Sequence, residues 1–208
     1  MEIIGRERER RILRDCEMSD RPEFVAIYGR RRVGKTFLIT EHFNNRFAFS
    51  VTGISDGSKR EQLAAFHRSL LKHYQGDTPM PSDWYEAFES LQGFISQDPS
   101  IGKKVLFIDE MPWLDTHKSG FLSALEHFWN AFASRRADIL LIVCGSATSW
   151  MIRNIINSYG GLSSRVTRKM VVEPFSLYEC EAFYTSRGIS FNRQQIAEAY
   201  MILGGIPW

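Results

Sequence analysis

The chain has 208 residues, of which 44% are hydrophobic and 24% are charged, as is typical of a globular protein with one sizeable core. Its 26 basic residues nearly balance its 24 acidic residues, and a net charge of +2 gives no argument for a nucleic-acid-binding protein. The 3 cysteines form neither a metal-binding pattern nor a disulfide framework, and no apolar run is long enough to span a membrane. We therefore expect a cytoplasmic protein, in a compartment that keeps cysteines reduced.

Hydrophobic periodicity predicts strands that alternate with helices along the chain. Nearly continuous apolar runs predict buried strands, and apolar residues spaced three or four positions apart predict helices. The predicted helices span residues 6–18, 36–43, 59–74, 83–96, 121–132, 176–187 and 192–203, and the predicted strands span residues 24–28, 46–51, 104–108, 139–144 and 170–172. This alternation predicts an α/β protein with three layers, in which helices cover both faces of a parallel sheet.

A glycine-rich loop directly follows the first predicted strand. Gly29 to Thr36 fits the pattern G-x-x-x-x-G-K-[ST], which is typical of a phosphate-binding loop between a strand and a helix. The glycines let backbone N–H groups turn toward phosphate oxygens, and the N-terminus of the next helix adds its positive dipole. In such a loop Lys35 reaches the terminal phosphates and the Thr36 hydroxyl ligates Mg²⁺. The nucleotide-binding residues predicted here are Gly29, Arg30, Arg31, Arg32, Val33, Gly34, Lys35, Thr36 and Phe37.

Three consecutive arginines, Arg30 to Arg32, lie inside this loop. Because the backbone of such a loop does the binding, we expect their side chains to be exposed. The alternative is that they contact nucleic acid or an acidic partner.

Two acids end the third predicted strand. Asp109 and Glu110 follow the apolar run Val105 to Ile108. At the carboxyl end of a strand, Asp109 is placed to hold Mg²⁺, and Glu110 is placed to polarise the water that attacks a γ-phosphate. The alternative is that these acids only form a solvated end of the strand. Together with the loop, they predict hydrolysis of a nucleoside triphosphate.

Weaker signals concern the contact with the γ-phosphate. If the strand that ends before Ser146 lies between the other two, Ser146 or Thr148 faces the γ-phosphate; the alternative is that either one caps the helix that begins near Ser149. Arg165 follows the glycine-bearing loop Gly160 to Ser164, and its guanidinium could neutralise charge on the γ-phosphate, within one chain or across a subunit contact. Arg168 and Lys169 compete for that role, and Arg165 could also be a merely solvated loop residue.

Taken together, these motifs resemble the STAND branch of AAA+-like P-loop ATPases, close to the archaeal-type ATPase family that is also abundant in bacteria. The segments that carry the resemblance are Ile4-Gly5-Arg6-Glu7, Gly29 to Thr36, Phe107 to Glu110, Cys144-Gly145-Ser146 and Gly205-Ile206-Pro207. The loop and the acid pair mark the superfamily, whereas I-G-R-E and G-x-P carry the narrower assignment. The resemblance spans nearly the whole chain.

The resemblance implies a sheet order of 5-1-4-3-2 and an ATPase core over residues 1–175. It also implies that residues 176–208 begin a small helical lid, with a winged-helix domain and an effector domain following Trp208. Arg6, Glu7 and Pro207 are expected around the adenine. Weak ATP hydrolysis is expected of a chain that lacks the later domains.

The leading hypothesis is an ATP-binding regulatory ATPase module with Mg²⁺ as cofactor, in which hydrolysis drives a conformational switch. Lys35, Glu110 and Arg165 are its expected catalytic residues, and Thr36 and Asp109 its metal ligands. The alternatives are a DNA-engaging ATPase of the origin-initiator kind and a nucleotide-binding scaffold that does not hydrolyse ATP. Self-association, DNA and a protein effector remain open as partners. Glu110 disfavours a small-molecule kinase, and the absence of an N-K-x-D stretch disfavours GTP.

Overall fold

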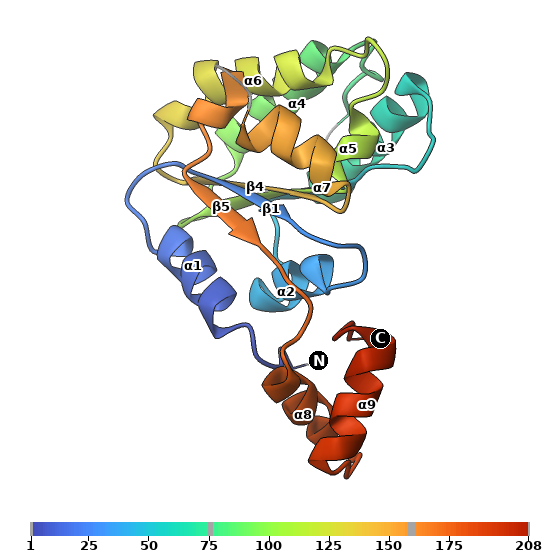
Figure 1. The fold of residues 1–208 in the computed structure, drawn as a ribbon. Helices are drawn as coiled ribbons and strands as arrows, with labels where there is room; N and C mark the ends of the chain where they lie inside the picture. The colour runs from blue at the N-terminus through green and yellow to red at the C-terminus, as the bar shows by residue number, and fades with distance from the viewer. Residues whose placement is uncertain (1, 75–76, 158–160, 208) are drawn as a thin grey trace.

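One parallel sheet of five strands organises the chain (Figure 1). The computed structural model describes residues 2–74, 77–157 and 161–207. The strands are β1 (Glu23–Tyr28), β2 (Phe49–Thr52), β3 (Lys104–Asp109), β4 (Ile139–Gly145) and β5 (Arg168–Val171), in the order β2-β3-β4-β1-β5. This confirms the predicted order 5-1-4-3-2, read from the opposite edge. Because the strands are parallel, the loops after β1, β3 and β4 meet at one edge of the sheet.

Helices cover both faces of the sheet (Figure 1). On one face, α1 (Glu7–Glu17) and α2 (Lys35–His42) pack on alternate strand residues such as Val25 and Ile27. On the other face, α3 (Lys59–His73), α4 (Trp84–Gln97) and α6 (Phe121–Ala131) pack on a set that includes Phe24. Side chains that follow one another in a strand point to opposite faces, and both faces here are apolar.

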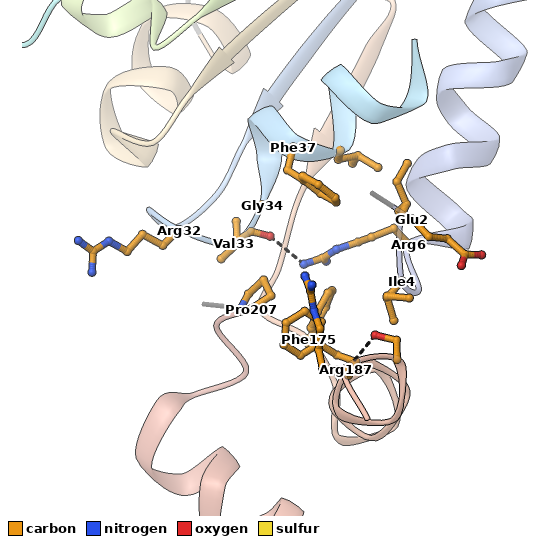
Figure 2. A pocket seen from close by; sticks show the side chains of 14 residues that line it. Glu2, Ile4, Arg6, Arg32, Val33, Gly34, Phe37, Phe175, Arg187 and Pro207 are labelled. Carbon is orange, nitrogen blue, oxygen red and sulfur yellow. Dashed lines mark hydrogen bonds between the residues drawn. The ribbon is translucent and has the colours of Figure 1, made fainter. Parts of the chain in front are cut away.

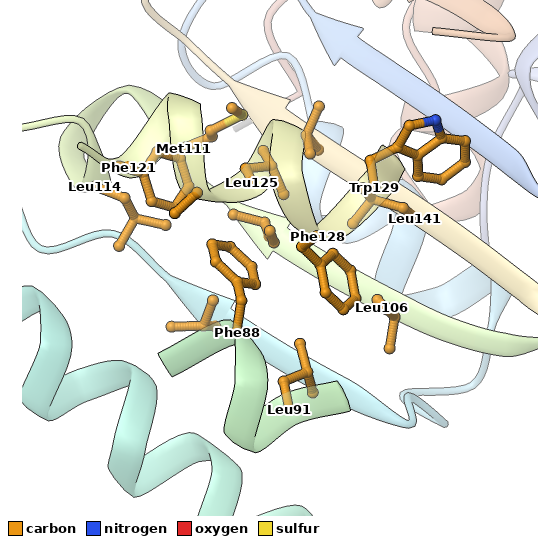
Figure 3. Packing of buried hydrophobic residues seen from close by; sticks show 14 of the residues in the cluster. Phe88, Leu91, Leu106, Met111, Leu114, Phe121, Leu125, Phe128, Trp129 and Leu141 are labelled. Atoms are coloured by element: carbon orange, nitrogen blue, oxygen red, sulfur yellow. The ribbon is translucent and has the colours of Figure 1, made fainter. Parts of the chain in front are cut away.

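Aromatic side chains fill much of the second face (Figure 3). Phe88 of α4 stacks on Phe128 of α6, with ring centroids 5.2 Å apart and an angle of 25° between the ring planes. Trp129 of α6 lies against Phe24 of β1, with centroids 4.9 Å apart. Interlocked rings of this kind contribute energy beyond the area they bury, and they make the sheet a rigid support for the loops at its edge.

The observed fold differs from the predicted one mainly in its short elements and in the start of one strand. The second strand begins at Phe49 rather than at residue 46, because Asn44 and Asn45 adopt φ angles of 50° and 54° and form a turn. The helix predicted near Ser149 is a short α7 (Thr148–Met151) that continues as a π-helical turn, η2 (Ile152–Ile156). Elements of four or five residues carry too few apolar positions for periodicity to detect. The other short elements are α5 (Met111–Leu114), η1 (Ala133–Arg135) and η3 (Gly161–Ser164).

Two further helices, α8 (Leu177–Ser186) and α9 (Arg193–Leu203), follow β5. They share a small cluster built on Phe175, Cys180 and Ile196, which is separate from the two clusters on the sheet. Capping boxes fix their N-termini, with Ser176 paired to Glu179 and Asn192 paired to Gln195. In Figure 1 this pair lies beyond α1 and α2, next to the N-terminal segment. Within the described ranges, no helix is long and apolar enough to cross a membrane.

Candidate functional site

The predicted phosphate-binding loop lies at the carboxyl end of β1 and leads into α2. Gly29 has a φ of 148°, and a Cβ atom there would lie 2.2 Å from the carbonyl oxygen of Val172. Gly34 has a φ of 88° and is the N-cap of α2. The position of Gly29 requires glycine because of the close backbone approach, and the position of Gly34 favours glycine because of its left-handed conformation. The side chains of Arg30, Arg31 and Arg32 are exposed, as expected.

Lys35 lies under this loop, with only 5% of its surface exposed. Its Nζ donates hydrogen bonds to the carbonyl oxygens of Gly29 and Arg30, each at 2.9 Å. These bonds hold the ammonium group inside the curve of the loop. The loop thus holds a positive charge close to its backbone, and a positive charge is what the terminal phosphates of a polyphosphate need.

Thr36 and Asp109 come from different elements and meet directly. The Thr36 hydroxyl donates a hydrogen bond of 2.8 Å to Oδ2 of Asp109, which ends β3 and is 4% exposed. Burial raises the pKa of Asp109, while the hydrogen bonds from Thr36 and from the Glu110 N–H act in the opposite direction. A hydroxyl and a carboxylate are hard oxygen donors of the kind that Mg²⁺ prefers. The residues present therefore fit the predicted metal.

Glu110 adopts a left-handed conformation with a φ of 45° at the start of α5. Its carboxylate oxygens lie 2.6 and 2.7 Å from the hydroxyl of Ser146, which donates to them, and the Ser146 N–H lies 3.2 Å from Oε2. The strand ends thus bring Glu110 and Ser146 together. The helix-capping alternative is wrong for Ser146 and Thr148, because Ala147 is the N-cap of α7 and no side chain caps it.

A cavity of about 370 Å³ opens beside the loop, between the N-terminal segment, α2 and α8 (Figure 2). This volume lies within the usual range of small-molecule sites. Of the three residues expected around the adenine, Arg6 and Pro207 line the cavity, whereas Glu7 is exposed on α1 and is not among the lining residues. The other lining residues include Ile3, Val33, Gly34, Phe37, Phe175, Phe183 and Arg187.

Arg6 is buried in the wall of this cavity and contacts groups on both sides of it. It is 6% exposed, and its Nη2 donates a hydrogen bond of 3.0 Å to the Val33 carbonyl. Its Cζ lies 4.7 Å from the centroid of the Phe175 ring. Burial lowers the pKa of Arg6, and the nearby carboxylates of Glu179 and Glu9 partly offset this. Sequence reasoning missed Phe175, Phe183 and Arg187 as lining residues, because no motif in the sequence marks them.

A second, shallower recess of about 550 Å³ lies on the Ser146 side of the loop. Arg30, Arg31 and Arg153 line it together with Ser146 and Trp150. None of these three arginines forms an ion pair with a carboxylate of another described residue. Sequence reasoning missed Arg153, which lies on the π-helical turn η2 that follows α7.

The structure does not bring Arg165 to the phosphate loop of its own chain. Arg165 precedes β5, and the N–H of Thr167 donates to the carbonyl of Phe24, near the start of β1. Gly29 lies at the other end of β1, roughly 16 Å farther along the strand direction. Arg168 pairs with Val25 and is also distant from the loop. Contact within one chain is therefore ruled out by the strand register, and Gly160 of the predicted loop lies outside the described residues.

Solved structures with this fold include several nucleotide-binding proteins. A Walker-type ATPase of Pyrococcus abyssi has a TM-score of 0.65 and 20% identity, and the likeness covers 99% of this chain and 65% of that chain. A STAND protein of Pyrococcus horikoshii with a tetratricopeptide repeat sensor has a TM-score of 0.56 and 22% identity, and the likeness covers 99% of this chain and 28% of that chain. Drosophila ORC bound to DNA has a TM-score of 0.60 and 17% identity, and the likeness covers 89% of this chain and 46% of that chain.

Sequence comparison gives a relative and a family. An uncharacterized protein of Methanocaldococcus jannaschii is 26% identical over 209 residues, which are 99% of this chain and 43% of that protein. The chain thus spans less than half the length of this relative. The family model described as an ATPase domain predominantly from Archaea matches residues 4–208. With the loop, the acid pair and the strand order in place, the chain belongs to this family of P-loop ATPase domains.

Proposed function

We propose that this chain is a Mg²⁺-dependent ATPase module whose nucleotide state changes the position of residues 176–208, which form the start of a helical lid. The observation that carries the proposal is the contact between Thr36 and Asp109, whose oxygens lie 2.8 Å apart. It joins the phosphate-binding loop to the acidic strand end, and Glu110 is the residue that follows Asp109. An acidic strand end outside a nucleotide site would not need to contact the threonine of a glycine-rich loop.

Each residue has a defined task in this proposal. The loop N–H groups and Lys35 bind the β- and γ-phosphates, and Thr36 and Asp109 hold the metal. Mg²⁺, when bound, supplies charge neutralisation on the phosphate oxygens. Glu110 polarises the attacking water as a general base, and for this its carboxylate has to exchange its hydrogen bond from Ser146 for one from water. Ser146 therefore holds the base in a defined position between turnovers.

The cavity at Arg6 is the proposed base site. Aromatic rings such as Phe37 and Phe175 offer faces on which a purine can stack, and Pro207 closes one side. ATP is favoured over GTP because the sequence contains no guanine-reading N-K-x-D stretch. We expect slow hydrolysis by the chain alone and faster hydrolysis where chains associate.

A DNA-engaging ATPase is the second candidate. Two observations favour it: Drosophila ORC bound to DNA is among the similar structures, and Arg30, Arg31 and Arg153 face one recess without carboxylate partners among the described residues. DNA phosphates would suit such a recess. An acidic segment of a protein effector would suit it as well.

Nucleotide titration followed by phosphate release tests the proposal. ATP, ADP and GTP are titrated by calorimetry, and phosphate release is then measured with Mg²⁺, with EDTA, and with duplex DNA at low salt. We expect ATP and ADP to bind, GTP to bind more weakly, and phosphate release to require Mg²⁺. Failure of every nucleotide to bind would refute the ATPase. Release that rises only with DNA would favour the second candidate.

A further inference from the structure

We propose that Arg6 is a positioning residue that links the phosphate-binding loop to α8 and α9, so that phosphate in the loop changes the mobility of these helices. The inference rests on the proposed function and adds a route of communication to it. It concerns one side chain and one backbone N–H, which together contact both sides of the cavity in Figure 2.

On the loop side, the guanidinium of Arg6 holds the carbonyl of Val33 at 3.0 Å. That carbonyl belongs to the same planar peptide group as the N–H of Gly34, and the two point in opposite directions. The Gly34 N–H is among the loop donors expected to face a phosphate. A phosphate that binds this N–H therefore fixes the orientation of the carbonyl that Arg6 holds.

On the lid side, Arg6 makes two contacts. Its guanidinium lies over the Phe175 ring at 4.7 Å, and its backbone N–H donates to Oε1 of Glu179 at 3.3 Å. Glu179 belongs to the capping box that begins α8. Gly5 allows this approach, because a Cβ atom there would lie 2.7 Å from Oε1 of Glu179. Any displacement of Arg6 therefore changes contacts at the start of α8.

The lid also returns to the loop by a second path. The Phe175 N–H donates to the Gly205 carbonyl at 2.8 Å, and Pro207 lies 3.9 Å from the position that a Cβ of Gly34 would occupy. Phe175 thus connects Arg6 to the segment from Gly205 to Pro207, which follows α9. A residue needed only to fill space would not require a guanidinium, yet Arg6 is 6% exposed and its guanidinium contacts a carbonyl, a ring and, at 3.8 Å, the Glu9 carboxylate.

Hydrogen exchange with tripolyphosphate as the probe tests the link, because this ligand engages the loop without a base in the cavity. The parent chain is compared with Arg6→Gln and with the control Arg8→Gln, which changes an exposed arginine in the first turn of α1. Amide exchange is followed over residues 177–203 at matched saturation of tripolyphosphate. In the parent and in Arg8→Gln we expect phosphate to slow exchange in α8 and α9 by about tenfold, and in Arg6→Gln by less than about twofold.

A merely structural role for Arg6 would lower the unfolding temperature and leave this response unchanged, and such a result would overturn the inference. If Arg6→Gln does not fold, Phe175→Leu removes the ring on the lid side while keeping an apolar residue there, and it should lose the same response. A parent that binds ATP without any change in α8 and α9 would refute the link and leave the ATPase standing. A parent that binds neither ATP nor tripolyphosphate would refute both.

Discussion

Three of the non-glycine residues with left-handed backbone conformations belong to the candidate site. Arg6, Arg32 and Glu110 have φ angles of 64°, 69° and 45°. Each such residue costs about 1–2 kcal/mol, and it persists only where neighbouring contacts hold it. For Arg6 the contact is the Val33 carbonyl, and for Glu110 it is Ser146. The site therefore uses strained residues to aim its side chains.

Lys35→Ala should remove nucleotide binding, because it deletes the charge that reaches the terminal phosphates. Truncation of a buried charged partner costs about 2–5 kcal/mol, or roughly 30-fold to several thousand-fold in affinity. Calorimetric titration with ATP measures the loss. Lys72→Ala, which changes an exposed lysine on α3, is the control and should bind ATP as the parent does. Unaltered ATP affinity in Lys35→Ala would mean that the loop has another purpose.

Glu110→Gln should retain ATP and Mg²⁺ but slow phosphate release. The amide preserves the shape of the side chain and can still accept from Ser146, but it cannot act as a base. Loss of one positioned base lowers the rate by roughly 10²–10⁴-fold. Single-turnover phosphate release checks this, with ATP affinity measured in parallel. Equal turnover in parent and variant would exclude Glu110 from the reaction.

At the scale of elements, the site depends on how firmly β1 is held at its start. Glu23, the first residue of β1, is 1% exposed, and it accepts hydrogen bonds from Ser19, Arg21 and Thr167. Thr167 also accepts from the Phe24 N–H at 3.0 Å. Burial raises the pKa of Glu23, but the hydrogen bonds outweigh it and the pKa is lowered. This carboxylate therefore ties the start of β1 to the segment before β5.

Glu23→Gln should destabilise the chain by about 1–3 kcal/mol at neutral pH, since hydrogen bonds to a charged group are lost. A lowered pKa in the folded state gives stability that is present above the ordinary value of 4.5 and is lost as pH falls through the folded value. The difference between parent and variant should therefore shrink below pH 4.5. Urea unfolding across this range measures it. Glu89→Gln on α4 is the exposed control, and a similar loss there would exclude a specific role for Glu23.

At the scale of the whole molecule, the sheet separates two ends with different properties. The loop, Asp109, Glu110 and Ser146 lie at the carboxyl edge, and Arg165 lies at the opposite edge near the start of β1. An arginine at that edge can meet a γ-phosphate only in a neighbouring chain. Arg153, which lines the recess beside Ser146 together with Arg30 and Arg31, is a candidate arginine within the same chain.

Arg165→Ala and Arg153→Ala should therefore differ in their dependence on protein concentration. If Arg165 acts across a subunit contact, the parent's turnover per chain rises with concentration and Arg165→Ala loses this rise, by roughly 10³–10⁵-fold where a finger completes a site. Arg153→Ala should lower turnover at every concentration. Phosphate release over a dilution series distinguishes the two. If turnover per chain in the parent does not depend on concentration, and Arg165→Ala has the same turnover as the parent, Arg165 is a solvated loop residue.

The sequence by itself determined the α/β class, the strand order implied by the resemblance, the phosphate-binding loop and the acid pair. Periodicity and contiguous motifs are local properties, and local order is what a chain encodes most directly. Short turns at Asn44 and after Met151 escaped it, because their conformations depend on a few backbone angles rather than on a repeated pattern.

Only the tertiary structure decided which distant side chains meet. The register of β5 against β1 placed Arg165 away from the loop of its own chain, whereas Arg153 on η2 lines a recess together with Arg30 and Arg31 of that loop. The contact of Ser146 with Glu110 depends on two strand ends lying side by side, and the position of Arg6 depends on how α8 packs against the N-terminal segment. Such contacts follow from long-range packing, which no window of sequence contains.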